Sequence, residues 1–132
     1  MQNLVSKKEE EERRLKALAE YRILGTKPES CYDDITKIAA TTCNVPISLM
    51  TLVDKDKQWF KSKIGLQISE TRRDWSFCTH AIKENSPLII HDAFQDERFI
   101  NNPLVTGDPK IRFYAGFPLR NNDGNKLGTL CV

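Results

Sequence analysis

The stretch IRFYAGFPLRNNDGNKLGTLCV, residues 111–132, decides the fold that the rest of the chain must adopt. Apolar residues alternate with other residues from Ile111 to Leu119, which is the period of a β-strand. Asn121–Gly124 is a strong turn signal, because an Asp-Gly pair tolerates the positive φ angles of a tight hairpin. Lys126–Val132 is apolar on both faces, as in a strand that is covered on two sides. The sequence therefore predicts a hairpin whose second strand is the innermost, antiparallel member of a sheet.

The composition is that of a single globular domain without a strongly charged surface. Hydrophobic residues make up 39% of the 132 residues, and 20 basic against 18 acidic residues give a net charge of +2. This balance favours neither nucleic acid nor membrane as a partner. No apolar run is long enough to cross a bilayer and the N-terminus has no signal-peptide core, so a cytoplasmic location is expected. The four cysteines form no C-x-x-C pair, which predicts buried thiols and no disulfide framework.

Residues 1–25 are interpreted as an N-terminal helical unit. Ser6 followed by Glu9 resembles a capping box, which predicts a helix through about Ile23 with Gly25 at its C-terminal cap. The first turns are strongly charged and the apolar seam is narrow, so two interpretations stay open. The helix either docks on the domain by one edge or pairs with a second copy of itself. The seam consists of Leu15, Leu18, Ala19 and Arg22.

The central part of the chain predicts a second helix and an antiparallel strand pair. Pro28 begins the helix, which runs to about Cys43 and packs on the sheet by a face of helical spacing. Pro46–Asp54 is apolar on both faces and predicts an interior strand. Gln58–Ile64 returns antiparallel, and its lysines, Lys61 and Lys63, indicate an edge that discourages further pairing. The predicted packing face of the helix consists of Tyr32, Ile35, Ile38, Ala39 and Thr42.

The rest of the chain predicts a loop, a short helix, a third strand and a long cover. Residues 65–73 have no clear period and are expected to form a loop, followed by a short helix within residues 74–85. Residues 87–92 (PLIIHD) predict a strand. Residues 93–110 form a connection of unusual length, with one helical turn expected at 96–100 and another at 103–105. Its expected apolar anchors are Phe94, Phe99, Pro103 and Leu104, and its expected polar ties are Asp92, Asp96 and Arg98.

Five segments together resemble the GAF domain family, in particular the GAF modules ahead of bacterial histidine kinases and diguanylate cyclases. They read VPISLMTLVDKDKQWFKSKIGL (45–66), SFCTHAI (76–82), PLIIHDAFQDERFINNPLVTG (87–107), IRFYAGFPL (111–119) and LGTLCV (127–132). The resemblance implies an α+β fold with a five-stranded antiparallel sheet in the order 2-1-5-4-3. It places the N-terminal helices on one face and a small-molecule pocket on the other. Residues 26–132 are expected to form the GAF domain, truncated after its last central strand and lacking the usual C-terminal helix.

The resemblance also implies where a ligand is expected to bind. Trp75 or Phe77 would stack on a planar ligand and His80 would supply a hydrogen bond. In the alternative interpretation these aromatic side chains fill the core and His80 caps a carbonyl. The expected ligand-binding residues are Trp75, Phe77, Cys78, His80, Arg112 and Tyr114. A basic rim of Arg72, Arg73, Lys110, Arg112 and Arg120 would suit an anionic ligand, unless these residues are solvated or paired with neighbouring carboxylates.

Three sharper chemistries are weighed against the residues. Covalent bilin attachment is disfavoured because Thr79 separates Cys78 from His80. A metal or haem site built from Cys78, His80, His91 and Asp92 lacks the ligand spacing of tetrahedral zinc, so no metal is expected. Free methionine sulfoxide reductases are also GAF proteins, but Cys78 has no evident resolving thiol, so no catalysis is expected.

The sequence thus favours a non-catalytic sensory GAF domain of a larger cytoplasmic signalling protein, for example in a two-component system. Its expected partners are an unidentified small-molecule ligand, an output domain and a second copy of the chain. The alternative is a scaffold without ligand that dimerises through residues 6–23 and the helical face of the sheet.

Overall fold

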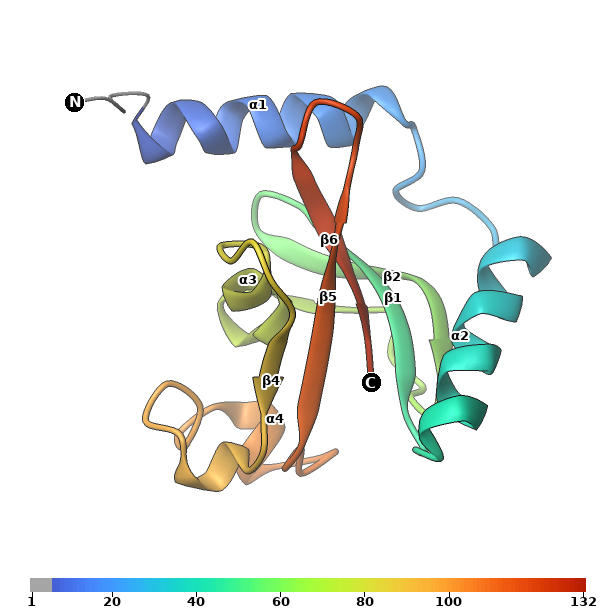
Figure 1. The fold of residues 1–132 in the computed structure, drawn as a ribbon, viewed down its shortest axis with the longest axis vertical. Helices are drawn as coiled ribbons and strands as arrows, with labels where there is room; N and C mark the ends of the chain where they lie inside the picture. The colour runs from blue at the N-terminus through green and yellow to red at the C-terminus, as the bar shows by residue number, and fades with distance from the viewer. Residues whose placement is uncertain (1–5) are drawn as a thin grey trace.

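The computed structural model describes residues 6–132 as a six-stranded antiparallel sheet with helices on both faces (Figure 1). The first five residues of the predicted N-terminal unit lie outside the described residues. The strands are β1 (Ser48–Val53), β2 (Lys57–Ile64), β3 (Glu70–Arg72), β4 (Leu88–Ile90), β5 (Tyr114–Arg120) and β6 (Lys126–Cys131). The helices are α1 (Lys7–Glu20), α2 (Ser30–Cys43), α3 (Phe77–Ala81) and α4 (Pro103–Thr106), with 3-10 turns η1 (Arg73–Trp75) and η2 (Ala93–Gln95).

The hairpin predicted from residues 111–132 is present, and β6 lies inside the sheet between β1 and β5, antiparallel to both. Gly124 adopts a φ of 84° in the turn, a conformation that costs a glycine little. Gly128 lies so close to the backbone of Thr51 that a Cβ atom has no room there. The innermost position predicted for the last strand is therefore confirmed. The preceding strand begins only at Tyr114, because Ile111–Phe113 pair with no other strand.

The predicted count of five strands is wrong, because the expected loop at residues 65–73 contains β3. The observed order is β3-β2-β1-β6-β5-β4, and the five predicted strands keep their predicted order within it. Lys57–Trp59 of β2 pair with β3, where buried Thr71 accepts a hydrogen bond of 3.0 Å from Gln58 Nε2. A three-residue strand is too short to show a period, and this contact depends on a residue 13 positions away.

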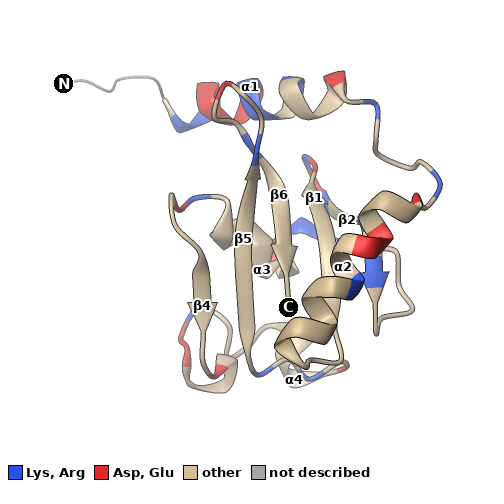
Figure 2. Cartoon of the chain, turned by 45° about the vertical axis from the view of Figure 1, so that its right-hand side comes forward, with Lys and Arg blue, Asp and Glu red and all other residues tan. Residues whose placement is uncertain are grey.

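Helix α1 crosses the sheet at the hairpin end and docks by a small apolar contact (Figure 1). Ser6 caps it as predicted, by accepting a hydrogen bond from Glu9 N at 3.1 Å. The helix ends at Glu20, and Arg22 follows with a φ of 50°, so Gly25 is not its cap. Its contact cluster consists of Ala17 and Leu18 with Leu52, Trp59 and Leu127. Figure 2 shows that charged residues crowd along α1, whereas the strands are mostly uncharged.

Helix α2 ends at Asn44, which adopts the left-handed conformation, but the predicted packing face is wrong. Ile35 and Ile38 are 42% and 64% exposed, whereas Thr36 is fully buried. Thr36 Oγ1 lies 2.7 Å from Ser62 Oγ of β2, and Ser62 donates to Asp33 Oδ1 at 2.6 Å. The helix is rotated relative to its hydrophobic pattern because these polar contacts, and not its isoleucines, face the sheet.

The edge role predicted for Lys61 is also wrong, because its side chain is fully buried beneath the segment that joins the two N-terminal helices. Its Nζ donates to Thr26 Oγ1 at 2.7 Å and to the Lys27 carbonyl at 2.6 Å, and it pairs with Glu29 Oε2 at 2.7 Å. The β1–β2 register passes from Ser62 directly to Phe60, which leaves Lys61 unpaired in a β-bulge. A bulge redirects side chains, and this one turns a lysine into the interior.

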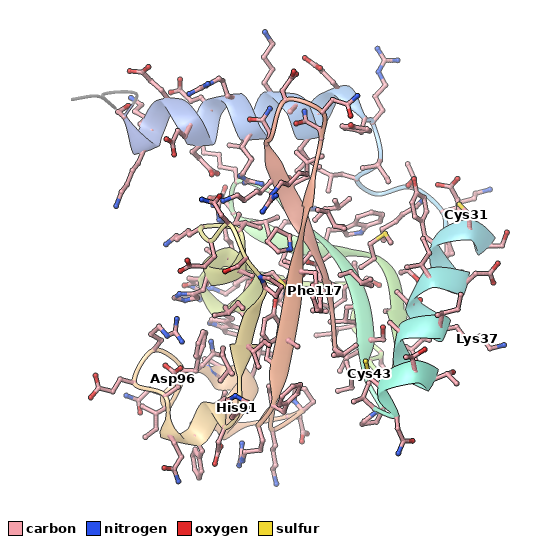
Figure 3. The ribbon with its side chains drawn as sticks, in the orientation of Figure 1. Cys31, Lys37, Cys43, His91, Asp96 and Phe117 are labelled. Carbon is pink, nitrogen blue, oxygen red and sulfur yellow. The ribbon has the colours of Figure 1, made fainter. Side chains whose placement is uncertain are left out.

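The cysteines divide into two groups, which corrects the expectation that all four are buried. Cys31 and Cys43 are exposed on α2, and Figure 3 places both on that helix near the surface. Cys78 and Cys131 are buried on the opposite side of the sheet. Within residues 6–132, no helix has the length and apolarity needed to cross a membrane.

Candidate functional site

A pocket of about 310 Å³ opens on the face of the sheet that α3 and α4 cover, opposite α1 and α2. This volume lies at the lower end of the range found for small-molecule sites. Its wall is mostly apolar and comes from the central strands, α3, the loop after β2 and residues 109–113. The apolar lining consists of Val45, Pro46, Ile47, Leu49, Phe60, Leu66, Ile68, Phe77, Leu104, Pro109, Ile111, Phe113 and Val132. The remaining lining residues are Gln58, Thr71, Cys78, Lys110, Arg112, Tyr114 and Cys131.

The structure brings four of the six expected ligand-binding residues together. Phe77, Cys78, Arg112 and Tyr114 all line the pocket. Trp75 and His80 do not belong to the lining. Trp75 lies in η1, before α3, and His80 lies on a face of α3 other than the one that Phe77 and Cys78 present to the pocket.

The two residues outside the lining contact the cover. The backbone carbonyl of Trp75 accepts a hydrogen bond from Asn102 Nδ2 at 2.9 Å, and the Arg72 guanidinium lies over its ring. The His80 ring packs edge-on against Phe99 at 4.8 Å. Burial, with the nearby cations Lys83 and Arg98, lowers the pKa of His80. These positions suit packing of α3 against the cover.

Phe77 joins the pocket wall to the core of the cover. Its ring stacks on Phe99 at 4.2 Å and contacts Tyr114 at 5.2 Å. Phe99 is fully buried, as its predicted role as an apolar anchor requires, and Leu104 is buried with it. Phe94 is instead 50% exposed beneath the Arg112 guanidinium. The inner wall is therefore built on an aromatic cluster of Phe77, Phe99 and Tyr114.

A polar network lies at the inner end of this apolar wall, centred on the sulfur of Cys78. Thr129 Oγ1 donates to Cys78 Sγ at 3.0 Å and the Tyr114 hydroxyl donates at 3.2 Å, while Cys131 Sγ lies 3.9 Å away. Because Thr129 uses its one hydroxyl proton on Cys78, the Thr51 hydroxyl donates to Thr129 Oγ1, 3.1 Å away, and Thr51 Oγ1 accepts from Thr129 N at 3.3 Å. The two hydroxyl groups thus form a one-way relay that ends on the sulfur.

This network changes the acidity of the buried thiols. Burial alone raises the pKa of Cys78, but the hydrogen bonds from Cys131, Thr129, Thr51 and Tyr114 outweigh it and lower the pKa to about 6. The hydrogen bond to Cys78, together with burial, raises the pKa of Cys131 well above its ordinary value. Burial and the neighbouring Cys78 raise the pKa of Tyr114. Of the two thiols, Cys78 is therefore the more acidic, and Cys131 keeps its proton.

Two polar residues fix α3 above the pocket. Ser76 caps the helix by accepting from Thr79 N at 3.2 Å, and its hydroxyl donates to Gln58 Oε1 at 2.6 Å. Gln58 Nε2 in turn donates to Thr71 of the added strand β3. The sequence left the cap open between Asp74 and Ser76 and gave no sign of Gln58, whose role depends on the pairing of β2 with β3.

The predicted basic rim is not assembled. Arg72 pairs with Asp74, Arg73 pairs with Glu11, and Arg120 donates to the Asn85 carbonyl. Only Lys110 and Arg112 line the pocket. Arg112 Nη1 donates to the Val105 carbonyl at 2.9 Å, which ties the residue to the cover. Among residues 6–132, no acidic side chain and no histidine lines the pocket, so its charged wall is entirely cationic.

Asn102 is a positioning residue that sequence reasoning missed. Its Oδ1 caps α4 by accepting from Leu104 N at 2.8 Å, and its Nδ2 reaches the Trp75 carbonyl. The Asn-Pro sequence carries a helix-start signal, because proline is favoured in the first turn and asparagine as the cap. The link to η1 is a tertiary contact that this local signal does not contain. The predicted local ties are confirmed, because Asp92 accepts from Phe94 N and Asp96 binds Arg98.

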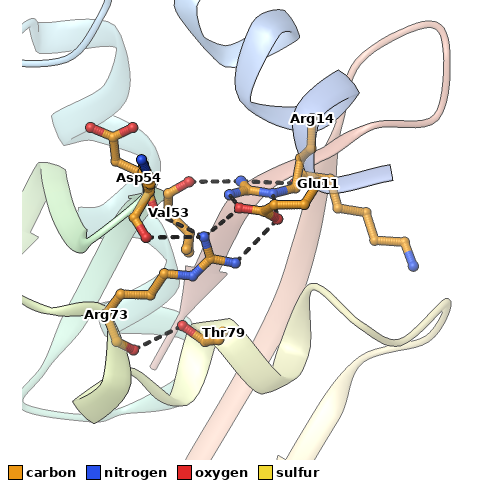
Figure 4. A network of polar contacts seen from close by, with 8 residues as sticks. Glu11, Arg14, Val53, Asp54, Arg73 and Thr79 are labelled. Atoms are coloured by element: carbon orange, nitrogen blue, oxygen red, sulfur yellow. Dashed lines mark hydrogen bonds and ion pairs between the residues drawn. The ribbon is translucent and has the colours of Figure 1, made fainter. Parts of the chain in front are cut away.

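A second polar network joins the segment before α3 to α1 (Figure 4). Arg73 contacts the Glu11 carboxylate through both terminal nitrogens and donates to the Asp54 carbonyl at 3.0 Å. Arg14 donates to Glu11 at 2.9 Å and to the Val53 carbonyl at 2.7 Å. Burial raises the pKa of Glu11, but its hydrogen bonds with the two arginines prevail and lower it from 4.5 to about 2. On the other side, the Arg73 carbonyl accepts from Thr79 Oγ1 in α3.

The residues weighed as metal ligands are not gathered. Cys78 is buried at the sheet, whereas His91 is exposed and its ring lies near Phe113. Figure 3 shows His91 at the lower end of the molecule. Across the part of the chain that the structure describes, no three His, Cys, Asp or Glu residues form a group suited to a metal ion.

The comparisons with known proteins agree on one family. The family model described as GAF domain matches residues 27–132. A cyclic di-GMP phosphodiesterase of Pseudomonas aeruginosa is 39% identical over 124 residues, which make up 94% of this chain. The chain spans only 21% of the length of that relative.

Solved structures show the same fold at low identity. A type II free methionine-R-sulfoxide reductase from Thermoplasma acidophilum gives a TM-score of 0.62 at 13% identity, covering 86% of this chain and 74% of that one. The GAF domain of a phosphoenolpyruvate-protein phosphotransferase from Coxiella burnetii gives 0.62 at 12%, covering 96% and 78%. The corresponding domain from Acinetobacter gives 0.59 at 16%, covering 100% and 77%. These likenesses concern the fold alone.

Proposed function

This chain belongs to the GAF domain family, and we propose that it is a non-catalytic regulatory module that binds a small molecule in the pocket beneath α3. The observation that carries the proposal is the pocket itself, which has a volume of about 310 Å³ and a wall that rests on stacked aromatic rings. A module whose pocket is filled by its own side chains would leave no such space.

The chemistry of the wall indicates the class of ligand. Apolar side chains make up most of the lining, and the only charged groups in it, among residues 6–132, are Lys110 and Arg112. Arg112 is already bonded to the Val105 carbonyl, so Lys110 is the cation better placed to meet a ligand. A small, mainly apolar molecule with one carboxylate matches this surface.

The connection between the pocket and α1 supports a regulatory role. Ligand contacts at Phe77 act on α3, which is bonded through Thr79 to Arg73, and Arg73 is bonded to Glu11 of α1. A ligand that prefers one position of α3 would therefore bias the position of α1. We propose that α1 passes this bias to an output domain in a longer signalling protein. The relative that is named a phosphodiesterase has most of its length outside the region it shares with this chain.

A thermal-shift and calorimetry series tests the ligand. Octanoate and phenylacetate serve as probes, and the matching uncharged amides serve as controls. The carboxylates are expected to raise the melting temperature through mass action, and the amides to raise it less. Lys110→Gln should remove the preference for the carboxylate, whereas Lys37→Gln on exposed α2 (labelled in Figure 3) should not change it. The proposal would be contradicted if no probe raised the melting temperature of the wild-type protein and Lys110→Gln behaved in the same way.

A second candidate function is self-association, favoured by exposed apolar side chains on the side of the sheet that α2 covers. Phe117 of β5 lies in register with Leu130, which pairs with Met50, and Met50 pairs with Ser62 beneath α2. Paired residues share a face, so Phe117 lies on the α2 side, where it is 49% exposed. Ile35 and Ile38 are exposed on the neighbouring helix. Sedimentation analysis of the purified chain distinguishes a dimer from a monomer.

A further inference from the structure

Two buried cysteines meet on the inner wall of the pocket, although they are 53 residues apart in the chain. Cys78 comes from α3 and Cys131 from the end of β6, and their sulfur atoms are 3.9 Å apart. A disulfide has a sulfur–sulfur distance of about 2.0 Å, so each sulfur needs to move by only about 1 Å. The sequence predicted that Cys78 has no evident resolving thiol. That prediction is wrong, because Cys131 lies close enough to serve as one.

The surroundings of Cys78 make its sulfur the nucleophile of the pair. Thr129 and Tyr114 donate hydrogen bonds to it, and a thiolate accepts such bonds far better than a thiol does. Cys131 has the opposite tendency, because it acts as a donor toward Cys78 and keeps its proton. Tyr114 and Cys131 are the titratable groups in contact with Cys78, and Lys110 and Arg112 are the charged groups of the same pocket.

The pocket gives a small molecule a route to the pair. Both cysteines are only 2–3% exposed in total, and both belong to the lining of the pocket. A hydroperoxide is far smaller than the space of about 310 Å³. The exposed thiols Cys31 and Cys43 lie on the other side of the sheet, and neither has a sulfur partner within the described residues.

We propose that Cys78 and Cys131 form an oxidation site that a small hydroperoxide reaches through the pocket, converting the dithiol to a disulfide. The Cys78 thiolate attacks the terminal peroxide oxygen and the O–O bond breaks. The other peroxide oxygen takes up the proton that Cys78 released on ionisation and leaves as alcohol or water. The resulting sulfenic acid is attacked by the Cys131 sulfur. An S–S bond forms, and the sulfenic oxygen leaves as water with the Cys131 proton. The peroxide gains two electrons and the two thiols lose two.

The disulfide would join α3 covalently to the central strand and alter the wall that contains Phe77. This modification requires access to the pocket but not a reversible ligand, so it goes beyond the function proposed above. Binding of a carboxylate and oxidation of the thiols can succeed or fail independently.

The experiment uses a Cys31→Ser/Cys43→Ser background, in which the buried pair supplies the only thiols of the chain. The protein is treated with stoichiometric hydrogen peroxide, and the remaining thiols are counted with a chromogenic disulfide reagent after denaturation. Loss of both thiols, with a peptide that joins Cys78 to Cys131 and is restored by dithiothreitol, is expected. Two intact thiols, at a peroxide dose that oxidises Cys31 and Cys43 in the wild-type protein, would overturn the proposal.

Single variants in the same background establish which sulfur attacks. Cys131→Ser is expected to accumulate a sulfenic acid at Cys78 that dimedone labels, whereas Cys78→Ser should leave Cys131 unreacted. The reverse pattern would contradict the assignment. Thr129→Val keeps the shape of the side chain and removes one donor to Cys78, so we expect oxidation about tenfold slower at pH 7. Circular dichroism and the melting temperature verify that each variant is folded, and equal rates in a folded Thr129→Val protein would contradict activation by this network.

Discussion

On the side of the sheet that α2 covers, a buried lysine and a Thr36–Ser62 contact hold the helical layer on the strands. On the α3 side, Phe77 stacks on Phe99 of the cover and contacts Tyr114 of β5. Directional bonds hold the first contact and leave Ile38 of α2 in solvent. Apolar burial holds the second, around Phe99 and Phe77. An interface made by apolar volume can surround an empty space, because its cohesion does not depend on a few fixed partners. The comparison explains why the pocket lies beneath α3 and not beneath α2.

Removing an aromatic ring from the α3 side should have the largest effect. Phe99 is fully buried and stacks on Phe77, so Phe99→Ala should lower the free energy of unfolding by about 4 kcal/mol, through lost burial and an added cavity. Urea denaturation followed by fluorescence measures the loss. The exposed Phe94 of the same cover offers a matched control, and Phe94→Ala should cost about 1 kcal/mol or less. Equal losses in the two variants would contradict the assignment of the core.

Truncating the buried Lys61 on the α2 side should lower the free energy of unfolding by somewhat less than Phe99→Ala does. Lys61→Ala removes a fully buried side chain and its bonds to Thr26, Lys27 and Glu29, so we expect a loss of about 3 kcal/mol in the free energy of unfolding. The Glu29 side chain is 55% exposed, and Glu29→Gln should cost only about 0.5 kcal/mol. A Lys61→Met variant separates packing from polar contacts. If it is as stable as wild type, the hydrogen bonds are not what holds this side.

The Glu11 network joins the two sides, and its effect should depend on pH. The pKa of Glu11 falls from 4.5 to about 2 in the folded state, so its contribution is fully present above the unfolded-state value. That contribution is lost as the pH falls through the folded-state value. Glu11→Gln should therefore lower the free energy of unfolding by about 1–2 kcal/mol at pH 7, allowing for partial solvent exposure. The difference from wild type should shrink steadily as the pH is lowered from 5 toward 2 in parallel urea titrations.

A difference between the two proteins that stays constant over this range would contradict the assigned role of the carboxylate. Glu12→Gln, at an exposed neighbouring position of the same helix, provides the control and should show no such trend.

The smallest change in stability is expected at the surface of α2. Ile38→Glu should change the free energy of unfolding by less than about 0.5 kcal/mol, because this side chain is 64% exposed. The same variant also tests whether the α2 side forms a dimer interface, through sedimentation analysis at increasing protein concentration. If wild type forms a dimer through the α2 side, the variant should be a monomer, whereas a dimer that persists in Ile38→Glu and in Phe117→Glu would exclude that surface.

The sequence pattern by itself determined the main strands and the interior position of the last one, and the resemblance to GAF domains supplied their order. The turn at Gly124 and the two-sided apolarity of β6 are local signals that the structure confirms. The alternation from Ile111 to Leu119 predicted a strand, but β5 begins at Tyr114 and its residues are not buried alternately, since Phe117 is 49% exposed. The resemblance to GAF domains placed α3 and the cover on one face of the sheet, where the pocket was found.

Only the tertiary structure decided which side chains meet. The bulge at Lys61, the added strand β3 and the rotation of α2 follow from strand register, to which a periodic pattern is blind. Cys78 meets Cys131 because β6 is threaded between β1 and β5, which brings its end beneath a helix formed 53 residues earlier. A local pattern records how one segment buries its own surface, whereas contacts between distant segments depend on how the whole sheet is assembled.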